Sequence, residues 1–254
     1  MNPTPKLFIL TMLHAEWIKQ KRNGIWWLVL LLPLGTTLAM GLDMVLRYAD
    51  YLHPQWAKTG GTSWELLLAE NHGVLGWGLF LPLFIAVLST FIHHVELKQP
   101  MWKQLLAMPI PKVCHYAAKY TTVMLFSLIL IILNSAGLIL IGWLMDFPEP
   151  FPLQLFLQYI LFQWVAIWGV AAIQNMLNIL MRNPVLPVCA ALAGMVASGM
   201  LLFHPSPMVA AFPYVQAFIA GDMSKIDPSY AVYGGIMSSI LFQAIGLYGF
   251  LRKE

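Results

Sequence analysis

Six stretches of the chain carry apolar residues almost without interruption, and each is bounded by proline, glycine or charge. A bilayer's hydrocarbon core is about 30 Å thick, so a helix of roughly 20 residues crosses it. Only a helix satisfies its own backbone hydrogen bonds in lipid without closing into a barrel. The pattern therefore predicts an all-α integral membrane protein with six transmembrane helices, at residues 24–46, 73–92, 120–145, 153–181, 185–203 and 230–251.

Composition agrees with this interpretation. Of the 254 residues, 59% are hydrophobic and only 10% are charged, and the mean hydropathy is +0.72. A soluble domain of this length needs a far more polar surface. The small net charge of +3 gives no reason to expect a nucleic-acid partner. Since no linker or repeat divides the sequence, we expect one transmembrane domain over residues 1–254.

The 14 lysine and arginine residues are distributed unevenly between the two sets of loops. By the positive-inside rule, the set that is richer in them faces the cytoplasm. This predicts that both termini and the loop 93–119 are cytoplasmic. The eleven residues on that side are Lys6, Lys19, Lys21, Arg22, Lys98, Lys103, Lys112, Lys119, Arg182, Arg252 and Lys253, against Arg47, Lys58 and Lys225 on the other.

Two cytoplasmic segments have the pattern of amphipathic helices. Within the first 23 residues, an apolar face that includes Leu10, Trp17 and Ile18 opposes a polar face with Glu16 and the lysines, so we expect a helix in the inner interface. In the loop 93–119, a helix of about nine residues is expected between Pro100 and Pro109. Its apolar stripe either binds a soluble partner or lies on lipid headgroups.

The segment 204–229 before the last span contains an apolar piece that is too short to cross the membrane and is interrupted by Pro213. We expect it to form a re-entrant or interfacial hairpin on the extracellular side, with its irregular backbone shielded by protein. Interfacial aromatic anchors account equally well for Tyr214 and Phe218.

Motifs for catalysis are missing or incomplete. The sequence has no G-x-x-x-x-G-K-[ST] loop and no Gly-Lys pair, so we expect no ATPase and no cofactor in this chain. His93, His94 and Glu96 lack the further ligands that a metal site needs. The glycine expected two residues before the nucleophile of a serine hydrolase is Val196 in the case of Ser198, and the small residues around that serine more often serve helix packing. We expect no catalytic and no metal-binding residue.

Polar side chains inside the predicted spans are the remaining candidates for function. Burying such a side chain in a bilayer is costly unless it is paired or faces a cavity. Either they line a transport pathway, or they hydrogen-bond neighbouring helices without touching a substrate. The candidates are Asn134, Gln163, Gln174, Asn178 and Gln243.

Short motifs on the cytoplasmic side resemble those of a known family. They are Glu16-x-x-Lys19-x-Lys21-Arg22, Glu96, Trp102-x-x-Leu105-Leu106-x-x-Pro109, and Tyr116-x-x-Lys119. With them the chain resembles the permease subunits of ABC-2 type transporters over nearly its whole length. Within that family it is most similar to the short permeases of lantibiotic-protection and related peptide-antibiotic systems.

The resemblance implies roles for the cytoplasmic helices. Residues 6–23, with Glu16, Trp17 and Lys19, would be the connecting helix, and residues 100–108 would be the coupling helix that fits a groove on a separate ATPase. Residues 204–229 would be the family's extracellular helical hairpin. The residues implied in coupling to the ATPase are Glu96, Met101, Trp102, Leu105, Leu106 and Pro109.

The resemblance also implies partners and a location. Two copies of an ABC ATP-binding subunit would hold ATP and Mg²⁺, and a second permease subunit, identical or homologous, would complete the pathway. The complex would lie in the bacterial cytoplasmic membrane and expel a peptide antibiotic, giving immunity to it. Two alternatives remain open: a membrane scaffold or sensor that recruits a cytoplasmic partner, and an intramembrane hydrolase.

Overall fold

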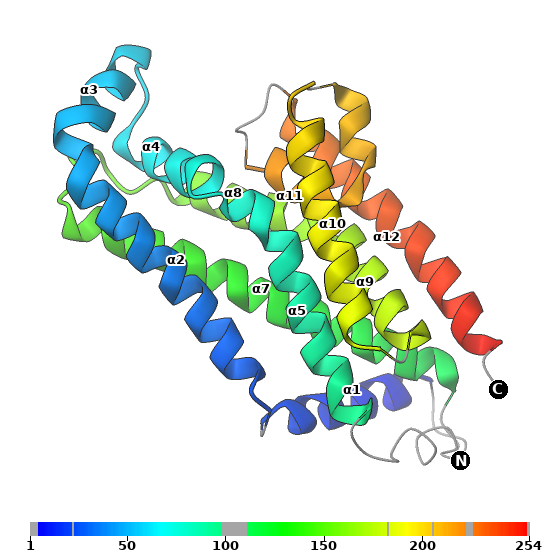
Figure 1. The fold of residues 1–254 in the computed structure, drawn as a ribbon. Helices are drawn as coiled ribbons and strands as arrows, with labels where there is room; N and C mark the ends of the chain where they lie inside the picture. Colours follow the sequence, from blue (N-terminus) through cyan, green and yellow to red (C-terminus); the bar gives the residue numbers. More distant parts are fainter. Residues whose placement is uncertain are drawn as a thin grey trace.

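The structure, a computed structural model, describes residues 5–21, 23–97, 111–181, 183–204, 206–221 and 226–252, and these residues contain helices and no β-strand. Figure 1 shows them as a helical bundle. Short π- and 3-10-helical turns join several of the helices. The helices are α1 (Pro5–Lys21), α2 (Ile25–Arg47), α3 (His53–Trp56), α4 (Ser63–Ala69), α5 (Trp77–Leu97), α7 (Lys112–Leu144), α8 (Leu153–Ala166), α9 (Trp168–Leu180), α10 (Val185–Leu201), α11 (Pro213–Ile219) and α12 (Pro228–Leu251).

Five helical stretches of the described chain are long and apolar enough to cross a membrane, which confirms the all-α membrane class. A sixth predicted span corresponds to α10, which has 17 residues and is shorter than the others. The prediction of six spans therefore depends on α10. The five longer stretches are Ile25–Trp56, Trp77–His94, Lys112–Leu144, Leu153–Leu180 and Pro228–Leu251.

The bundle has two distinct ends (Figure 1). Helix α1 and the C-terminal end of α12 lie at one end, which we call the proximal end. Helices α3 and α4 and the N-terminal end of α12 lie at the other, which we call the distal end. Both described ends of the chain thus lie at the same end of the bundle. This agrees with an even number of crossings, while the orientation in a membrane stays a prediction.

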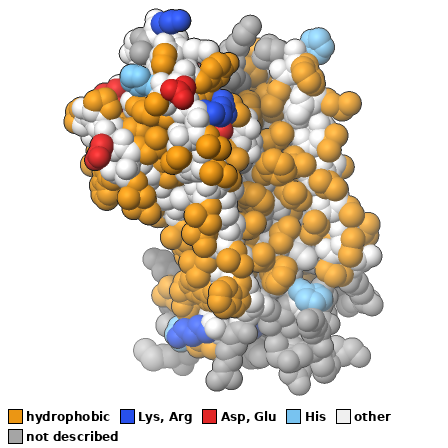
Figure 2. Space-filling model, turned by 60° about the vertical axis from the view of Figure 1, so that its left-hand side comes forward, with side chains coloured by type: hydrophobic (Ala, Val, Ile, Leu, Met, Phe, Trp, Pro, Cys, Tyr) orange, Lys and Arg blue, Asp and Glu red, His pale blue; other side chains and the backbone are white. Residues whose placement is uncertain are grey.

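The largest buried apolar cluster joins α2, α5, α7 and α9. Helix α5 packs against α7, α9 and α10, and α9 packs along α12. In contrast, only 22% of the residues in the apolar part of the spans that contain α2 and α12 are buried, against 50–61% in the other three spans. Figure 2 shows apolar side chains over most of the molecular face, with acidic side chains near one end. Such a surface suits lipid or a second membrane subunit.

Three span boundaries differ from the prediction. Helix α7 begins at Lys112 instead of residue 120, so the segment 112–119 is helical rather than part of a loop. Helix α5 begins at Trp77 instead of residue 73, because a π-helical turn and Gly76, whose φ is +80°, precede it. The fourth predicted span is divided at Ile167 into α8 and α9.

One part of the pattern predicted for α1 was wrong. Leu10 and Ile18 were expected on an apolar face toward the inner interface, and Glu16 was expected to point away from it on the polar face. Leu10 and Ile18 are exposed at the surface of the protein, but Glu16 is buried inside it. The reason is that α1 packs along α7, where a lysine is available to neutralise Glu16.

Candidate functional site

A buried ion pair joins α1 to α7 at the proximal end. Nζ of Lys119 lies 2.7 Å from Oε2 of Glu16, and both side chains are only 1% exposed. Lys19 binds the other carboxylate oxygen of Glu16, also at 2.7 Å, and Lys119 donates a hydrogen bond to the backbone carbonyl of Ile92 at 3.3 Å. Because burial of an unpaired charge is very unfavourable, this arrangement holds α1, α5 and α7 together at one point.

Trp17 adds an aromatic contact at the same place. Its ring lies 5.7 Å from Trp26 on α2 and 5.5 Å from Phe126 on α7, and these two rings lie 5.2 Å apart. Aromatic pairs at such distances stabilise packing beyond their buried area. The structure therefore brings together Glu16, Trp17 and Lys19, the three residues implied in the connecting helix, and adds Lys119 to them.

The residues implied in coupling fall mostly outside the described part of the chain. Met101, Trp102, Leu105, Leu106 and Pro109 lie in 98–110, which the structure does not describe. The flanks of that segment are described: Glu96 belongs to the last turn of α5, and α7 starts just after the segment. The contact of Lys119 with the Ile92 carbonyl therefore joins the two helices on either side of the coupling segment.

Asn134 belongs to a buried polar network in the distal half of the bundle. Its amide nitrogen donates to Thr36 on α2 at 3.1 Å, and its oxygen accepts from Asn71 at 3.3 Å. Asn71 also donates to the hydroxyl of Tyr159 on α8, at 3.4 Å. Buried hydrogen bonds between side chains of different helices, such as these, fix how the helices meet.

His72 extends this network to α11. Its Nδ1 lies 3.0 Å from the Tyr159 hydroxyl, and its Nε2 lies 2.9 Å from the backbone carbonyl of Phe218. Complete burial lowers the pKa of His72 to about 4, so the ring is neutral at pH 7. A neutral ring with the proton on Nε2 donates to Phe218 and accepts from Tyr159, which satisfies both nitrogens.

Gln163 adjoins this network, because its amide nitrogen donates to the backbone carbonyl of Tyr159 at 3.3 Å. Its oxygen accepts the indole N–H of Trp77 on α5 at 2.7 Å. Gln174 donates to Tyr214 on α11 at 3.1 Å. Asn178, one helical turn further along α9, donates to Ser89 on α5 at 3.3 Å.

Gln243 on α12 is only partly buried, and its amide nitrogen has no hydrogen-bond partner among the described residues. Asn134, Gln163, Gln174 and Asn178 thus make contacts between helices, and the five candidates do not converge on one cavity. These contacts support the interpretation that the four paired residues hold the helices together.

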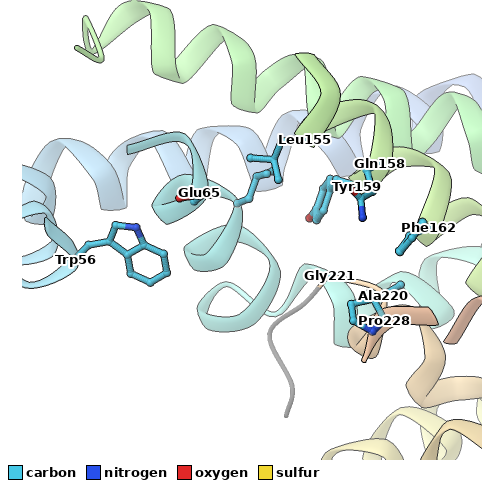
Figure 3. A pocket seen from close by; sticks show the side chains of 10 residues that line it. Trp56, Glu65, Leu155, Gln158, Tyr159, Phe162, Ala220, Gly221 and Pro228 are labelled. Atoms are coloured by element: carbon cyan, nitrogen blue, oxygen red, sulfur yellow. The ribbon is translucent and has the colours of Figure 1, made fainter. Parts of the chain in front are cut away.

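An open pocket of about 340 Å³ lies at the distal end (Figure 3). Trp56 and Glu65 stand on one side of it, Tyr159 and Phe162 on α8 stand on the other, and Pro228 at the start of α12 lies below them. The pocket therefore adjoins the buried network through Tyr159. Such concave sites with apolar walls and a few polar groups are typical ligand sites.

A family model described as an ABC-2 family transporter protein matches residues 12–198 of this chain, from α1 into α10. The chain belongs to the ABC-2 transporter family. Comparison with curated proteins and with solved structures gives no significant match.

Membership of the ABC-2 family confirms the broad resemblance seen in the sequence and makes the chain a multi-pass membrane permease of an ABC exporter. It also implies a partnership with an ATP-binding subunit. The matched range includes both members of the buried pair, Glu16 and Lys119, and the undescribed segment 98–110. The lantibiotic-protection subgroup is a finer assignment that this match does not make.

Several residues that are prominent in the structure of this ABC-2 permease could hardly be identified from the sequence alone. Asn71 and His72 stand at the edge of an apolar run, where a loop was expected, and nothing in that pattern predicts burial. Trp56 and Tyr159, which line the distal pocket, are 103 positions apart in the printed sequence and meet only through the fold. Lys119 was identified in the sequence only as a motif residue and a positive charge.

Proposed function

We propose that this chain is the membrane-spanning subunit of an ABC-2 exporter in which a separate subunit binds and hydrolyses ATP. The chain itself would hold neither ATP nor Mg²⁺ and would have no catalytic residue. The observation that carries this proposal, beside the family membership, is the buried Glu16–Lys119 pair, which joins α1 to the helices that flank segment 98–110.

In the proposed mechanism, residues 100–108 are the coupling helix that an ATPase grips. Closure of the ATPase dimer would displace this helix, and the displacement would reach α5 and α7 directly because they are its two flanks. The Glu16–Lys119 contact would make α1 move with them. Rigid elements that rock between two arrangements are a common way to transmit such a displacement.

The proposed assembly has two permease subunits, identical or homologous, over two ATP-binding subunits in the bacterial cytoplasmic membrane. The cytoplasmic side would be the proximal end, where α1 and the end of α12 lie. The two least buried spans, those with α2 and α12, offer apolar faces for lipid and for the second permease. The asymmetric distribution of lysine and arginine supports this orientation.

The proposed cargo is a peptide antibiotic, as in the lantibiotic-protection systems that the sequence resembles, so the complex would confer immunity. This part of the proposal depends on the short cytoplasmic motifs. A host that expresses the permease with its ATPase should survive a higher concentration of such a peptide than a host with the ATPase alone.

The coupling role is tested with Trp102→Ala and Leu106→Asp, which would spoil the apolar face that the ATPase grips. Both variants should insert normally and lose export and the stimulation of ATP hydrolysis in proteoliposomes. Trp143→Ala is the matched control, because Trp143 is an exposed tryptophan near the distal end of α7. Export and ATPase stimulation that survive both coupling substitutions would refute the assignment. A scaffold that recruits its partner would bind it with no dependence on nucleotide.

A further inference from the structure

The distal pocket combines segments that are far apart in the sequence. The α3–α4 region contributes Trp56 and Glu65, α8 contributes Leu155 and Tyr159, and Pro228 belongs to the start of α12. Figure 3 shows these side chains around a common opening. A pocket of about 340 Å³ is large enough for a bulky apolar side chain or a short alkyl group.

One wall of the pocket is held in place by the buried network. The Tyr159 ring lines the opening, while its hydroxyl is bonded to His72 and Asn71 behind it. Gly221 is also part of the lining, and a Cβ atom there would overlap the His72 ring. The wall is therefore formed in advance, which reduces the entropy lost when a ligand binds.

The charged group that lines the pocket is negative. Glu65 is the only charged residue among the ten that line it, and its side chain is exposed. One of its oxygens accepts the Thr62 backbone N–H at 2.8 Å in the capping box of α4, which fixes the carboxylate at the rim. The second oxygen stays available for an approaching cation.

The distal end as a whole is acidic. Its described residues carry seven carboxyl groups against two cationic side chains, Arg47 and Lys58. Arg47 is already bound to Asp43 at 2.7 Å. A surface with this balance raises the local concentration of cations and repels anions. The seven are Asp43, Asp50, Glu65, Glu70, Asp146, Glu149 and Asp227.

We propose that the distal pocket is a binding site for a cationic amphipathic molecule, with its apolar part against Leu155, Phe162 and Pro228 and its cationic group between Glu65 and the Trp56 ring. A carboxylate and an indole together favour a cation over an anion or a neutral group. The assignment deepens the proposed export function, on which its biological meaning rests: the pocket would meet the cargo at the distal end of its path.

The test uses the purified full-length permease without an ATPase, in a neutral detergent. Its probes are two dansyl-labelled hexapeptides, one alternating leucine with lysine and the other leucine with glutamate. Fluorescence anisotropy gives a Kd for each. Glu65→Gln removes the charge and keeps an oxygen for the capping box. Leu155→Trp fills the pocket. Asp146→Asn is the control, since it removes a distal carboxylate outside the pocket lining at a residue with φ of +49°, which asparagine tolerates.

The lysine peptide should bind more tightly than the glutamate peptide. Glu65→Gln should raise the Kd for the lysine peptide by about threefold to fivefold, which is the range of an exposed ion pair. It should leave the Kd for the glutamate peptide unchanged or slightly lower. Leu155→Trp should weaken both peptides, and Asp146→Asn should leave the preference intact. Leu155→Ala, which removes apolar contact without adding bulk, should also weaken both.

Equal affinity for the two peptides, or binding that survives both Glu65→Gln and the Leu155 substitutions, would overturn the assignment. The assignment would also be overturned if Asp146→Asn removed the preference for the lysine peptide as fully as Glu65→Gln does. The negative potential of the whole distal end, and not the pocket, would then cause the preference. None of these results bears on the coupling role of Trp102, since no ATPase is present. Loss of the pocket assignment and loss of the export function are therefore separate outcomes.

Discussion

Lys119 and Glu16 are 103 positions apart in the sequence, yet their charged groups meet at 2.7 Å inside the protein. Lys119 has a second contact with the Ile92 carbonyl, and Glu16 has a second contact with Lys19, which is only partly buried. Glu16 therefore binds two ammonium groups, and Lys119 supplies only one of them. That difference leads to an asymmetric prediction for their substitutions.

Glu16→Gln should destabilise the protein more than Lys119→Met. The glutamine removes a carboxylate that binds two ammonium groups, those of Lys119 and Lys19, and breaking a buried pair in this way costs about 3 to 5 kcal/mol. In Lys119→Met, Glu16 keeps its ion pair with Lys19. Chemical unfolding of the purified permease in detergent, followed by far-UV circular dichroism, measures both free energies of unfolding.

The double variant Glu16→Gln/Lys119→Met is the internal control for this prediction. It replaces the ion pair with two uncharged side chains of similar size, so it should recover most of the stability that Glu16→Gln loses. A double variant no more stable than Glu16→Gln alone would mean that the two charges do not stabilise each other.

The spans could be predicted from the sequence because the bilayer sets their length and excludes charge. The start of α7 shows the limit of this reasoning. Lys119 reads as a flanking charge, and the positive-inside rule places it outside the apolar helix, whereas it is buried inside α7. Its burial depends on Glu16 in a distant helix, and no local pattern contains that contact.

The candidate site was predictable to a similar degree. The five polar residues in the spans could be identified because polarity is rare there, and Glu16, Trp17 and Lys19 came from the family motifs. Their partners could not, since Thr36 and Asn71 meet Asn134, and Tyr159 meets Asn71, only when α2, α7, α8 and the turn Glu70–Val74 have packed together. The distal pocket likewise needs α4, α8 and α12 in place before it exists.

His72 should make stability depend on pH between about 6.5 and 4. Burial lowers its pKa to about 4, so over that range the unfolded chain binds a proton that the folded chain does not. The neutral ring's contribution is complete above pH 6.5 and is lost as pH falls, by up to about 3 kcal/mol. Urea unfolding at several pH values measures the loss.

His72→Gln is the control for this pH dependence. Glutamine can donate to the Phe218 carbonyl and accept from Tyr159, but it does not titrate. Stability of the variant should fall less than that of the wild type between pH 6.5 and 4. If the two proteins lose the same free energy over this interval, carboxyl groups and not His72 cause the dependence.

Gly78→Ala should destabilise the permease, because a Cβ atom there would overlap the ring of His72, which is buried and bonded on both sides. Overpacking of this kind costs about 1 to 3 kcal/mol. Gly35→Ala is the matched control, since Gly35 also lies inside a long apolar helix and nothing lies within 4 Å of its added Cβ. Alanine there should be neutral or stabilising by about 0.5 to 1 kcal/mol. Thermal unfolding midpoints compare the two.

Gln163 and Gln243 should respond in opposite ways to replacement by leucine. Gln163 accepts the indole N–H of the buried Trp77 at 2.7 Å, so Gln163→Leu leaves that donor unsatisfied, at a cost of about 1 to 3 kcal/mol. For Gln243 the amide nitrogen already has no partner among the described residues, so Gln243→Leu removes an unpaired polar group and should be neutral or stabilising.

Export separates a structural role from a pathway role for these two residues. If Gln163 acts by holding α5 to α8, a Gln163→Leu variant that is kept folded at low temperature should export its cargo at the wild-type rate per folded molecule. A rate that falls while the protein stays folded would instead place Gln163 on the pathway. For Gln243, a partly buried side chain of α12 whose amide nitrogen has no hydrogen-bond partner among the described residues, a fall in export with no loss of stability would mark a contact with cargo or with the second permease subunit.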